Sequence, residues 1–217
     1  LLGSVMIVVL GVLDDIMALK ALPKLIVQIA AAGIAVYHGC VIQFFSNPNV
    51  FSDVSYVNLG WLSIPISSIW IVAITNAVNF IDGLDGLAVG VSAISTASLI
   101  VIALLVSETN IAMVLIALLG ACLGFIPYNM NPAKIFMGDT GATFLGYILA
   151  TLSITGLFKL YAIISFAVPF LILGVPIFDI CFAFLRRIAK GQNPMVADRG
   201  HVHHRLIDMG FSQKQSV

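Results

Sequence analysis

The sequence predicts an all-α fold, a polytopic integral membrane bundle with about seven spans. Composition is the first reason, because 60% of the 217 residues are hydrophobic and only 9% are charged, whereas soluble domains carry about 25% charged residues. The second reason is that apolar runs near the length of a span, about 17 to 25 residues, alternate with short polar segments. A helix satisfies its own backbone hydrogen bonds in lipid, so each run is expected to be helical.

Seven apolar runs are the candidate spans. They cover about 1–13, 24–45, 62–81, 87–106, 111–128, 142–158 and 160–178. The segment from Gln43 to Gly60 carries Asn47-Pro48-Asn49 and then alternating apolar residues, which predicts a short external hairpin. We interpret residues 1–217 as a single membrane-embedded domain and expect it to be truncated at both ends, because Leu1 already lies inside an apolar run.

The positions of the basic residues predict the orientation. If successive spans alternate in direction, nine of the ten Lys and Arg residues share one side with most of the acidic residues, and only Lys159 lies on the other. An excess of Lys and Arg marks the cytosolic side. We therefore expect the acidic loops to face the cytosol.

Charge and cysteine spacing narrow the range of partners. The formal net charge is zero and no basic tract alternates with aromatic residues, so nucleic acid is not expected as a partner. Cys40, Cys122 and Cys181 are far apart and form no C-x-x-C, which indicates neither a zinc site nor a disulfide framework. The lipid bilayer is the expected environment, and a homodimer is compatible with the sequence.

Asp14 and Asp15 close the first apolar run, and Lys24 begins the next. Adjacent carboxylates repel, so at a membrane surface a metal ion, another cation, water or a proton must hold them together. A solvated helix end is the alternative for the pair, and a lysine that reaches the lipid interface is the alternative for Lys24.

The stretch from Asn76 to Gly86 places two amides and two carboxylates between two apolar runs, where an unpaired charge is costly. Gly83 and Gly86 favour a tight turn at a membrane surface over a continuous charged helix. The turn would display Asn79, Asp82 and Asp85 at the mouth of the bundle. An ordinary polar loop facing water remains the alternative.

Asp139 lies between Gly138 and Gly141, directly before another apolar run, in a loop that also contains Asn129. This arrangement predicts a carboxylate beside a helix start whose free N–H groups attract anions, phosphate above all. A helix N-cap role for Asp139 is equally compatible with the pattern.

Three histidines and two arginines lie within the segment from Asp198 to Arg205. The histidine spacing i, i+2, i+3 is poor for zinc on one helix face, so an anionic, phosphorylated ligand is favoured over zinc. A basic patch facing anionic lipid headgroups is the alternative. Combined with the acidic clusters, these residues fit a magnesium-dependent reaction on a diphosphate.

Taken together, these motifs resemble those of a known family, the bacterial polyprenyl-phosphate N-acetylhexosamine 1-phosphate transferases of the glycosyltransferase family 4 type. The resemblance rests on Leu13-Asp14-Asp15, Asn76 to Gly86, Ile135 to Gly141 and His201 to His204, in that order, and it covers essentially the whole chain. The form of the histidine motif is closest to members that use UDP-N-acetylglucosamine. The resemblance implies a multi-pass enzyme of the bacterial plasma membrane with its active site in cytosolic loops.

The resemblance also implies a reaction and roles for single residues. Undecaprenyl phosphate would attack UDP-N-acetylglucosamine, giving undecaprenyl-diphospho-N-acetylglucosamine and UMP, with Mg²⁺ as cofactor and Mn²⁺ as a substitute. Asp14, Asp15 and Lys24 would be catalytic, and Asp139 and Asn79 would hold the metal. The implied nucleotide-binding residues are Asp82, Asp85 and Asn129, and the implied sugar-diphosphate-binding residues are His201, His203, His204 and Arg199.

Two alternatives stay open. Within the same class, the donor would be another UDP-amino sugar such as UDP-N-acetylmuramoyl-pentapeptide. From a different class, an ion-coupled membrane transporter would use membrane-level carboxylates as a permeation path. The transporter predicts ionisable groups near span centres and on both sides, whereas the acidic residues here gather on one side.

Overall fold

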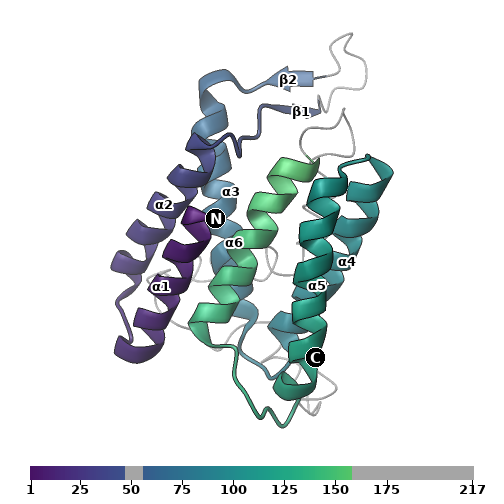
Figure 1. The fold of residues 1–217 in the computed structure, drawn as a ribbon. Helices are drawn as coiled ribbons and strands as arrows, with labels where there is room; N and C mark the ends of the chain where they lie inside the picture. Colours follow the sequence, from purple (N-terminus) through teal and green to yellow (C-terminus); the bar gives the residue numbers. More distant parts are fainter. Residues whose placement is uncertain (47–55, 158–217) are drawn as a thin grey trace, which may run out of the picture.

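The computed structural model describes residues 1–46 and 56–157, which form a bundle of helices with one small hairpin (Figure 1). The elements in order are α1 Leu2–Met17, α2 Ala21–Tyr37, β1 Phe44–Ser46, β2 Tyr56–Asn58, the 3₁₀ turn η1 Gly60–Leu62, α3 Ser63–Ile81, α4 Leu87–Leu105, α5 Thr109–Asn129 and α6 Gly138–Leu157. The expected seventh span at 160–178 and the histidine segment lie outside the described residues.

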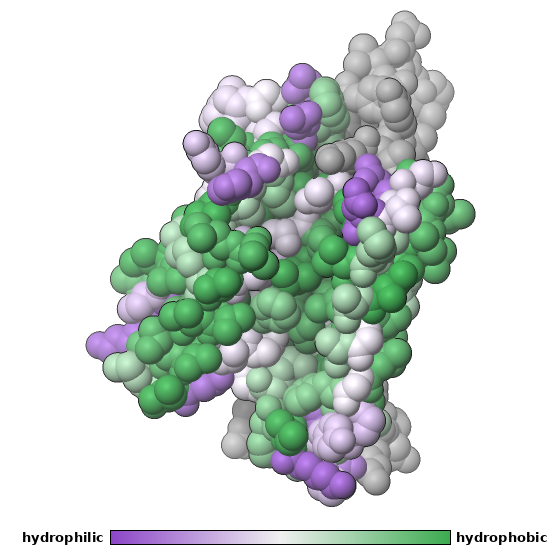
Figure 2. Space-filling view, in the orientation of Figure 1, coloured by the Kyte–Doolittle hydropathy of each residue, from purple (hydrophilic) through white to green (hydrophobic). Residues whose placement is uncertain are grey.

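Membrane-protein character is clear in the helices. Three helical stretches are long and apolar enough to cross a membrane, namely Gly60–Ile81, Leu87–Leu105 and Thr109–Asn129, and α2 is a shorter apolar helix. In the space-filling view, apolar side chains cover the middle of the molecule and polar ones gather toward its two ends (Figure 2). The mostly helical fold and its apolar surface therefore agree with the class expected from composition.

The second predicted span differs most from the structure. The run at 24–45 predicted one long helix, but α2 ends at Tyr37 and the chain turns at Gly39, whose φ is 90°. The Ile42 N–H then donates to Ser67 Oγ at 2.8 Å, which holds this segment against α3. An antiparallel hairpin follows, with Phe44 opposite Asn58, and its two strands lie inside the segment from Gln43 to Gly60 where the sequence predicted a hairpin.

Helix α6 lies at the centre of the described bundle, in contact with α1, α3, α4 and α5. Two glycines allow the backbones of neighbouring helices to approach closely. A Cβ at Gly146 would lie 2.7 Å from Thr75 Cα of α3, and a Cβ at Gly11 of α1 would lie 2.3 Å from Thr140 Cα of α6. Fully buried aliphatic residues, among them Ile7, Ile71, Ile74 and Leu149, fill the core between these helices.

The connections divide between the two ends of the bundle. The α1–α2, α3–α4 and α5–α6 connections lie together at the lower end in Figure 1, and the hairpin and the α4–α5 connection lie at the upper end. This alternation places residues 18–20, 82–86 and 130–137 on one side of the molecule. The acidic motifs of the sequence therefore meet at one end.

Candidate active site

Asp14 lies in the last turn of α1, just before the connection to α2, and it is almost completely buried at 6% exposure. Ala18 adopts a left-handed conformation with φ 48°, which reverses the chain directly after the helix. The Leu19 N–H then donates to Asp14 Oδ1 at 2.8 Å. Asp14 is thus fixed by the turn that follows it, and its other oxygen faces α2.

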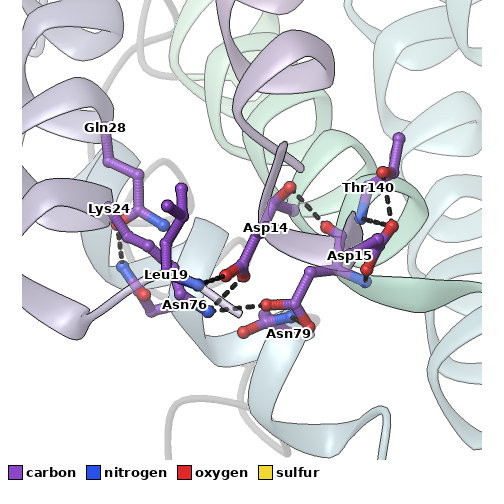
Figure 3. Close-up of polar contacts among 10 residues, drawn as sticks. Asp14, Asp15, Leu19, Lys24, Gln28, Asn76, Asn79 and Thr140 are labelled. Atoms are coloured by element: carbon purple, nitrogen blue, oxygen red, sulfur yellow. Dashed lines mark hydrogen bonds and ion pairs between the residues drawn. The ribbon is translucent and has the colours of Figure 1, made fainter. Parts of the chain in front are cut away.

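Lys24 contacts both Asp14 and Asp139, although Asp139 follows Lys24 by 115 residues. Figure 3 shows Asp14, Lys24 and Asn79 gathered around this contact. Its ammonium group forms an ion pair with Asp14 Oδ2 and another, at 2.8 Å, with Asp139 Oδ2. Asn79 Nδ2 donates to the second oxygen of Asp139 at 3.1 Å. These four residues come from α1, α2, α3 and α6, and we call them the junction.

A pair of amides lies next to the junction, between α2 and α3. Asn76 Nδ2 donates to Gln28 Oε1 at 2.6 Å and to the Val72 carbonyl at 2.8 Å, and Gln28 is only 3% exposed. Gln28 lies one helical turn after Lys24, on the same face of α2. Sequence reasoning did not single out Gln28, although this i, i+4 spacing from Lys24 was the available signal.

Asp15 points away from Asp14 and binds the first turn of α6 (Figure 3). Its carboxylate accepts hydrogen bonds from the Asp139 N–H at 2.8 Å, the Thr140 N–H at 3.2 Å and Thr140 Oγ1 at 2.6 Å. The expectation that this helix start offers free N–H groups to phosphate was therefore wrong, because Asp15 already occupies two of them. Asp139 is not the cap either, since its own carboxylate faces Lys24 and Asn79.

The α3–α4 turn and the α5–α6 loop are tied together by Asn129. This side chain is 2% exposed, and it accepts from the Gly86 N–H at 3.1 Å and donates to the Ile135 carbonyl at 3.0 Å. Gly86 has a φ of 85°, as the glycine of a tight turn should. Asn129 therefore holds the two loops together.

Asp85 makes a second link between the same two loops. Its Oδ2 accepts from Asn131 Nδ2 and from the Ala133 N–H, both at 3.1 Å. Asp82, in the same turn, is half-buried. Burial, reinforced by the negative charges of Asp139, Asp85 and Asp15, raises the pKa of Asp82 to about 7. The loop end of the molecule thus carries an excess of negative charge that a bound cation would relieve.

The donors at this end fit Mg²⁺. Within residues 1–46 and 56–157, no group of three or more His, Cys, Asp or Glu side chains is arranged to hold a metal ion by itself. Mg²⁺ does not need one, because it is commonly bound through one or two carboxylates together with substrate phosphates. Both oxygens of Asp139 have a protein partner, and each has a further lone pair for a cation. The remaining candidates, His201, His203, His204 and Arg199, lie outside the described residues.

Two relatives match this chain over nearly its whole length and a third over 71% of it. It is 45% identical over 215 residues, 99% of this chain and 59% of the relative, to a probable undecaprenyl-phosphate N-acetylglucosaminyl 1-phosphate transferase of Bacillus subtilis (strain 168). It is 34% identical over 98% of its length, and 57% of the relative, to a decaprenyl-phosphate N-acetylglucosaminephosphotransferase of Mycolicibacterium smegmatis. A phospho-N-acetylmuramoyl-pentapeptide-transferase of Limosilactobacillus fermentum is 35% identical over 71% of this chain and 46% of the relative.

The chain spans less than two thirds of the length of each of these relatives. The model of glycosyl transferase family 4 matches residues 1–157, which include every residue of the junction. The chain therefore belongs to glycosyl transferase family 4.

Proposed function

We propose that this protein transfers N-acetylglucosamine 1-phosphate from UDP-N-acetylglucosamine to undecaprenyl phosphate, giving undecaprenyl-diphospho-N-acetylglucosamine and UMP. Such a transfer is the first membrane step in making a cell-wall polysaccharide, for example a teichoic acid. The observation that carries the proposal is the junction, where Asp14, Lys24, Asn79 and Asp139 converge from four helices. The relatives named for N-acetylglucosamine transfer, which align over 98% or more of the chain, support the choice of sugar.

The chemistry requires two anions to approach each other. An oxygen of the lipid phosphate attacks the β-phosphorus of the donor, and the bond from that phosphorus to the bridging oxygen of UMP breaks. Asp14, which is buried beside Lys24, would orient or deprotonate the attacking phosphate. Lys24 would exchange one of its carboxylate partners for a phosphate oxygen and so offset the repulsion between the two anions.

The metal and the donor would lie next to Lys24. Asp139 and Asn79 would hold Mg²⁺, or Mn²⁺ in its place, and the ion would supply positive charge to the diphosphate. The turn with Asp82 and Asp85 would shape the nucleotide pocket, held in place by Asn129. The sugar diphosphate would be bound by His201, His203, His204 and Arg199.

We infer that the protein crosses the bacterial plasma membrane several times with this end in the cytosol. Lys20, Lys24 and Lys134 all belong to the end that carries the junction, as the positive-inside rule requires. A nucleotide sugar carries a charged diphosphate, which does not cross lipid unaided. The site that uses it is therefore expected to face the compartment that supplies it, the cytosol.

A second candidate remains for the identity of the donor sugar. The match to a muramoyl-pentapeptide transferase over 71% of the chain keeps that donor as an alternative within the same class. Both donors deliver a sugar phosphate to a polyprenyl phosphate, so the junction does not separate them.

An assay in membranes from cells that express the protein tests the proposal. Radiolabelled UDP-N-acetylglucosamine and UDP-N-acetylmuramoyl-pentapeptide are each supplied with undecaprenyl phosphate, in Mg²⁺ and in EDTA. We expect UMP and labelled lipid from the first donor only, and only in Mg²⁺. Labelled lipid from the pentapeptide donor alone would reassign the donor, and no transfer from any UDP-sugar would remove the proposed function.

A further inference from the structure

The first turn of α6 is capped by a residue from another helix. The first N–H groups of a helix have no partner within the helix, and Asp is among the preferred side chains for them. A cap normally comes from the residue just before the helix. Here the cap is Asp15 of α1, which is 124 positions before Asp139 and accepts three hydrogen bonds at this turn.

The start of α6 leaves space for this carboxylate. Gly138 has a φ of 65°, and a Cβ at this position would lie 2.8 Å from Asp15 Oδ2. Any side chain at residue 138 would therefore displace Asp15. Glycine meets both the backbone and the space requirement.

The approach of α1 to α6 is fixed one helical turn earlier on the same face. Gly11 precedes Asp15 by four residues, and a Cβ at Gly11 would overlap the backbone of Thr140. The close contact at Gly11 and the Asp15 cap therefore both involve the first turn of α6. Together they fix where this turn lies relative to α1.

The two adjacent aspartates consequently have different tasks. Asp14 reaches Lys24 in the junction, whereas Asp15 binds backbone and the Thr140 hydroxyl. Asp139 is the residue where these contacts meet, because its N–H is bound by Asp15 and its carboxylate by Lys24 and Asn79. The position of the Asp139 carboxylate depends on the backbone that Asp15 holds.

We propose that Asp15 is a positioning residue, which caps α6 from α1 and so holds the Asp139 carboxylate against Lys24 and Asn79. It is not a proton acceptor or a ligand of the metal. Its effect on transfer rests on the proposed function, but the cap itself does not.

Hydrogen exchange measured by mass spectrometry on peptides covering residues 137–143, in the purified protein without metal, tests the cap directly. Asp15→Ala should speed exchange at the Asp139 and Thr140 amides by about tenfold, roughly the factor that corresponds to losing one N-cap. Asp14→Ala is the matched control, because Asp14 makes no contact with these amides in the described structure, and its exchange should stay within about twofold of the parent. Unchanged exchange in Asp15→Ala would overturn the proposal.

Replacement by other capping residues separates positioning from catalysis. Asn and Ser accept hydrogen bonds from helix N–H groups but neither takes up a proton as a carboxylate does. Asp15→Asn and Asp15→Ser should therefore retain more transfer activity and a lower Mg²⁺ requirement than Asp15→Ala, by about tenfold. If all three variants are equally inactive while Asp15→Asn keeps slow exchange at the α6 start, the positioning role is wrong. If the parent protein transfers no sugar phosphate, the exchange measurement still decides the cap.

Discussion

At the scale of single residues, Lys24 is the cation that allows Asp14 and Asp139 to lie close together. Both carboxylates contact its ammonium group, and Asp14 is almost fully buried. Two carboxylates in such a place repel each other unless a cation or a proton intervenes. The junction therefore depends on one side chain for its charge balance.

Replacing that side chain should loosen the junction even without substrate. We expect Lys24→Met to lower the free energy of unfolding by about 1–3 kcal/mol, below the usual cost of breaking a fully buried ion pair because Lys24 is partly exposed. Thermal unfolding in detergent, without metal, measures this. Lys20→Met is the matched control, since Lys20 is exposed in the same connection, and equal melting temperatures for the two variants would contradict the expectation.

A second residue-scale prediction concerns the metal. Asp139→Asn should abolish transfer, because the amide removes the negative charge that we assign to Mg²⁺ binding, while the protein still inserts into the membrane. Transfer activity across a Mg²⁺ titration, with membrane content measured by immunoblot, checks it. Glu108→Gln, the same kind of change at the hairpin end of the bundle, should be active, and full activity of Asp139→Asn would rule out the metal role.

The residues of the junction could be predicted from the sequence, but the different contacts of the neighbouring residues Asp14 and Asp15 could not. Asp14, Lys24, Asn79 and Asp139 were predictable as one group, because each is a polar residue at the edge of an apolar run. The separate orientation of Asp15 depends on the contact of Gly11 with Thr140, and long-range packing of that kind leaves no local pattern. Gln28 was missed because a single amide inside an apolar run is unremarkable without its partner Asn76.

At the scale of elements, α6 carries Asp139 and its packing against α3 determines where Asn79 can reach it. The closest approach is at Gly146, where an added Cβ would lie 2.7 Å from Thr75 Cα and 2.9 Å from the Ile74 carbonyl oxygen. These are backbone atoms, so the neighbour cannot turn aside as a flexible side chain would. Any side chain at residue 146 must separate the two helices.

We expect Gly146→Ala to destabilise the protein by about 1–3 kcal/mol, as overpacking of a core does, and to weaken transfer by moving Asn79 away from Asp139. Thermal unfolding and the transfer assay are the measurements. Gly120→Ala in α5 is the control, because a Cβ there meets nothing within 4 Å in the described structure. A variant at Gly146 with the melting temperature of the control would show that α3 and α6 can separate freely.

Helix positions were predictable from hydropathy, whereas the end of α2 was not. Residues 38–45 contain no Lys, Arg, Asp or Glu, and only His38, Gly39 and Gln43 interrupt the apolar run. Their extended course depends on the left-handed turn at Gly39 and on the hydrogen bond from Ile42 to Ser67. A run of apolar residues indicates burial, and burial alone does not distinguish a helix from an extended segment.

At the scale of the whole molecule, the alternation of connections between two ends makes the orientation testable. Lys20 is exposed at the junction end and Asn110 is exposed at the hairpin end. In a variant with Cys40, Cys122 and Cys181 changed to Ala, Lys20→Cys should react with a membrane-impermeant maleimide only in inside-out vesicles. Asn110→Cys should react only in right-side-out vesicles, and labelling of both from the same side would contradict the alternating arrangement.

The buried amide of Asn129 has a consequence for how the molecule can open. Because the Asn129 side chain is hydrogen-bonded to both the α3–α4 turn and the α5–α6 loop, we expect those two segments to move together. Helices α1 and α2 meet the start of α6 through the Lys24–Asp139 ion pair, the Asp15 cap and the close contact of Gly11 with Thr140. Reactants that enter beside these loops should therefore displace both segments or neither.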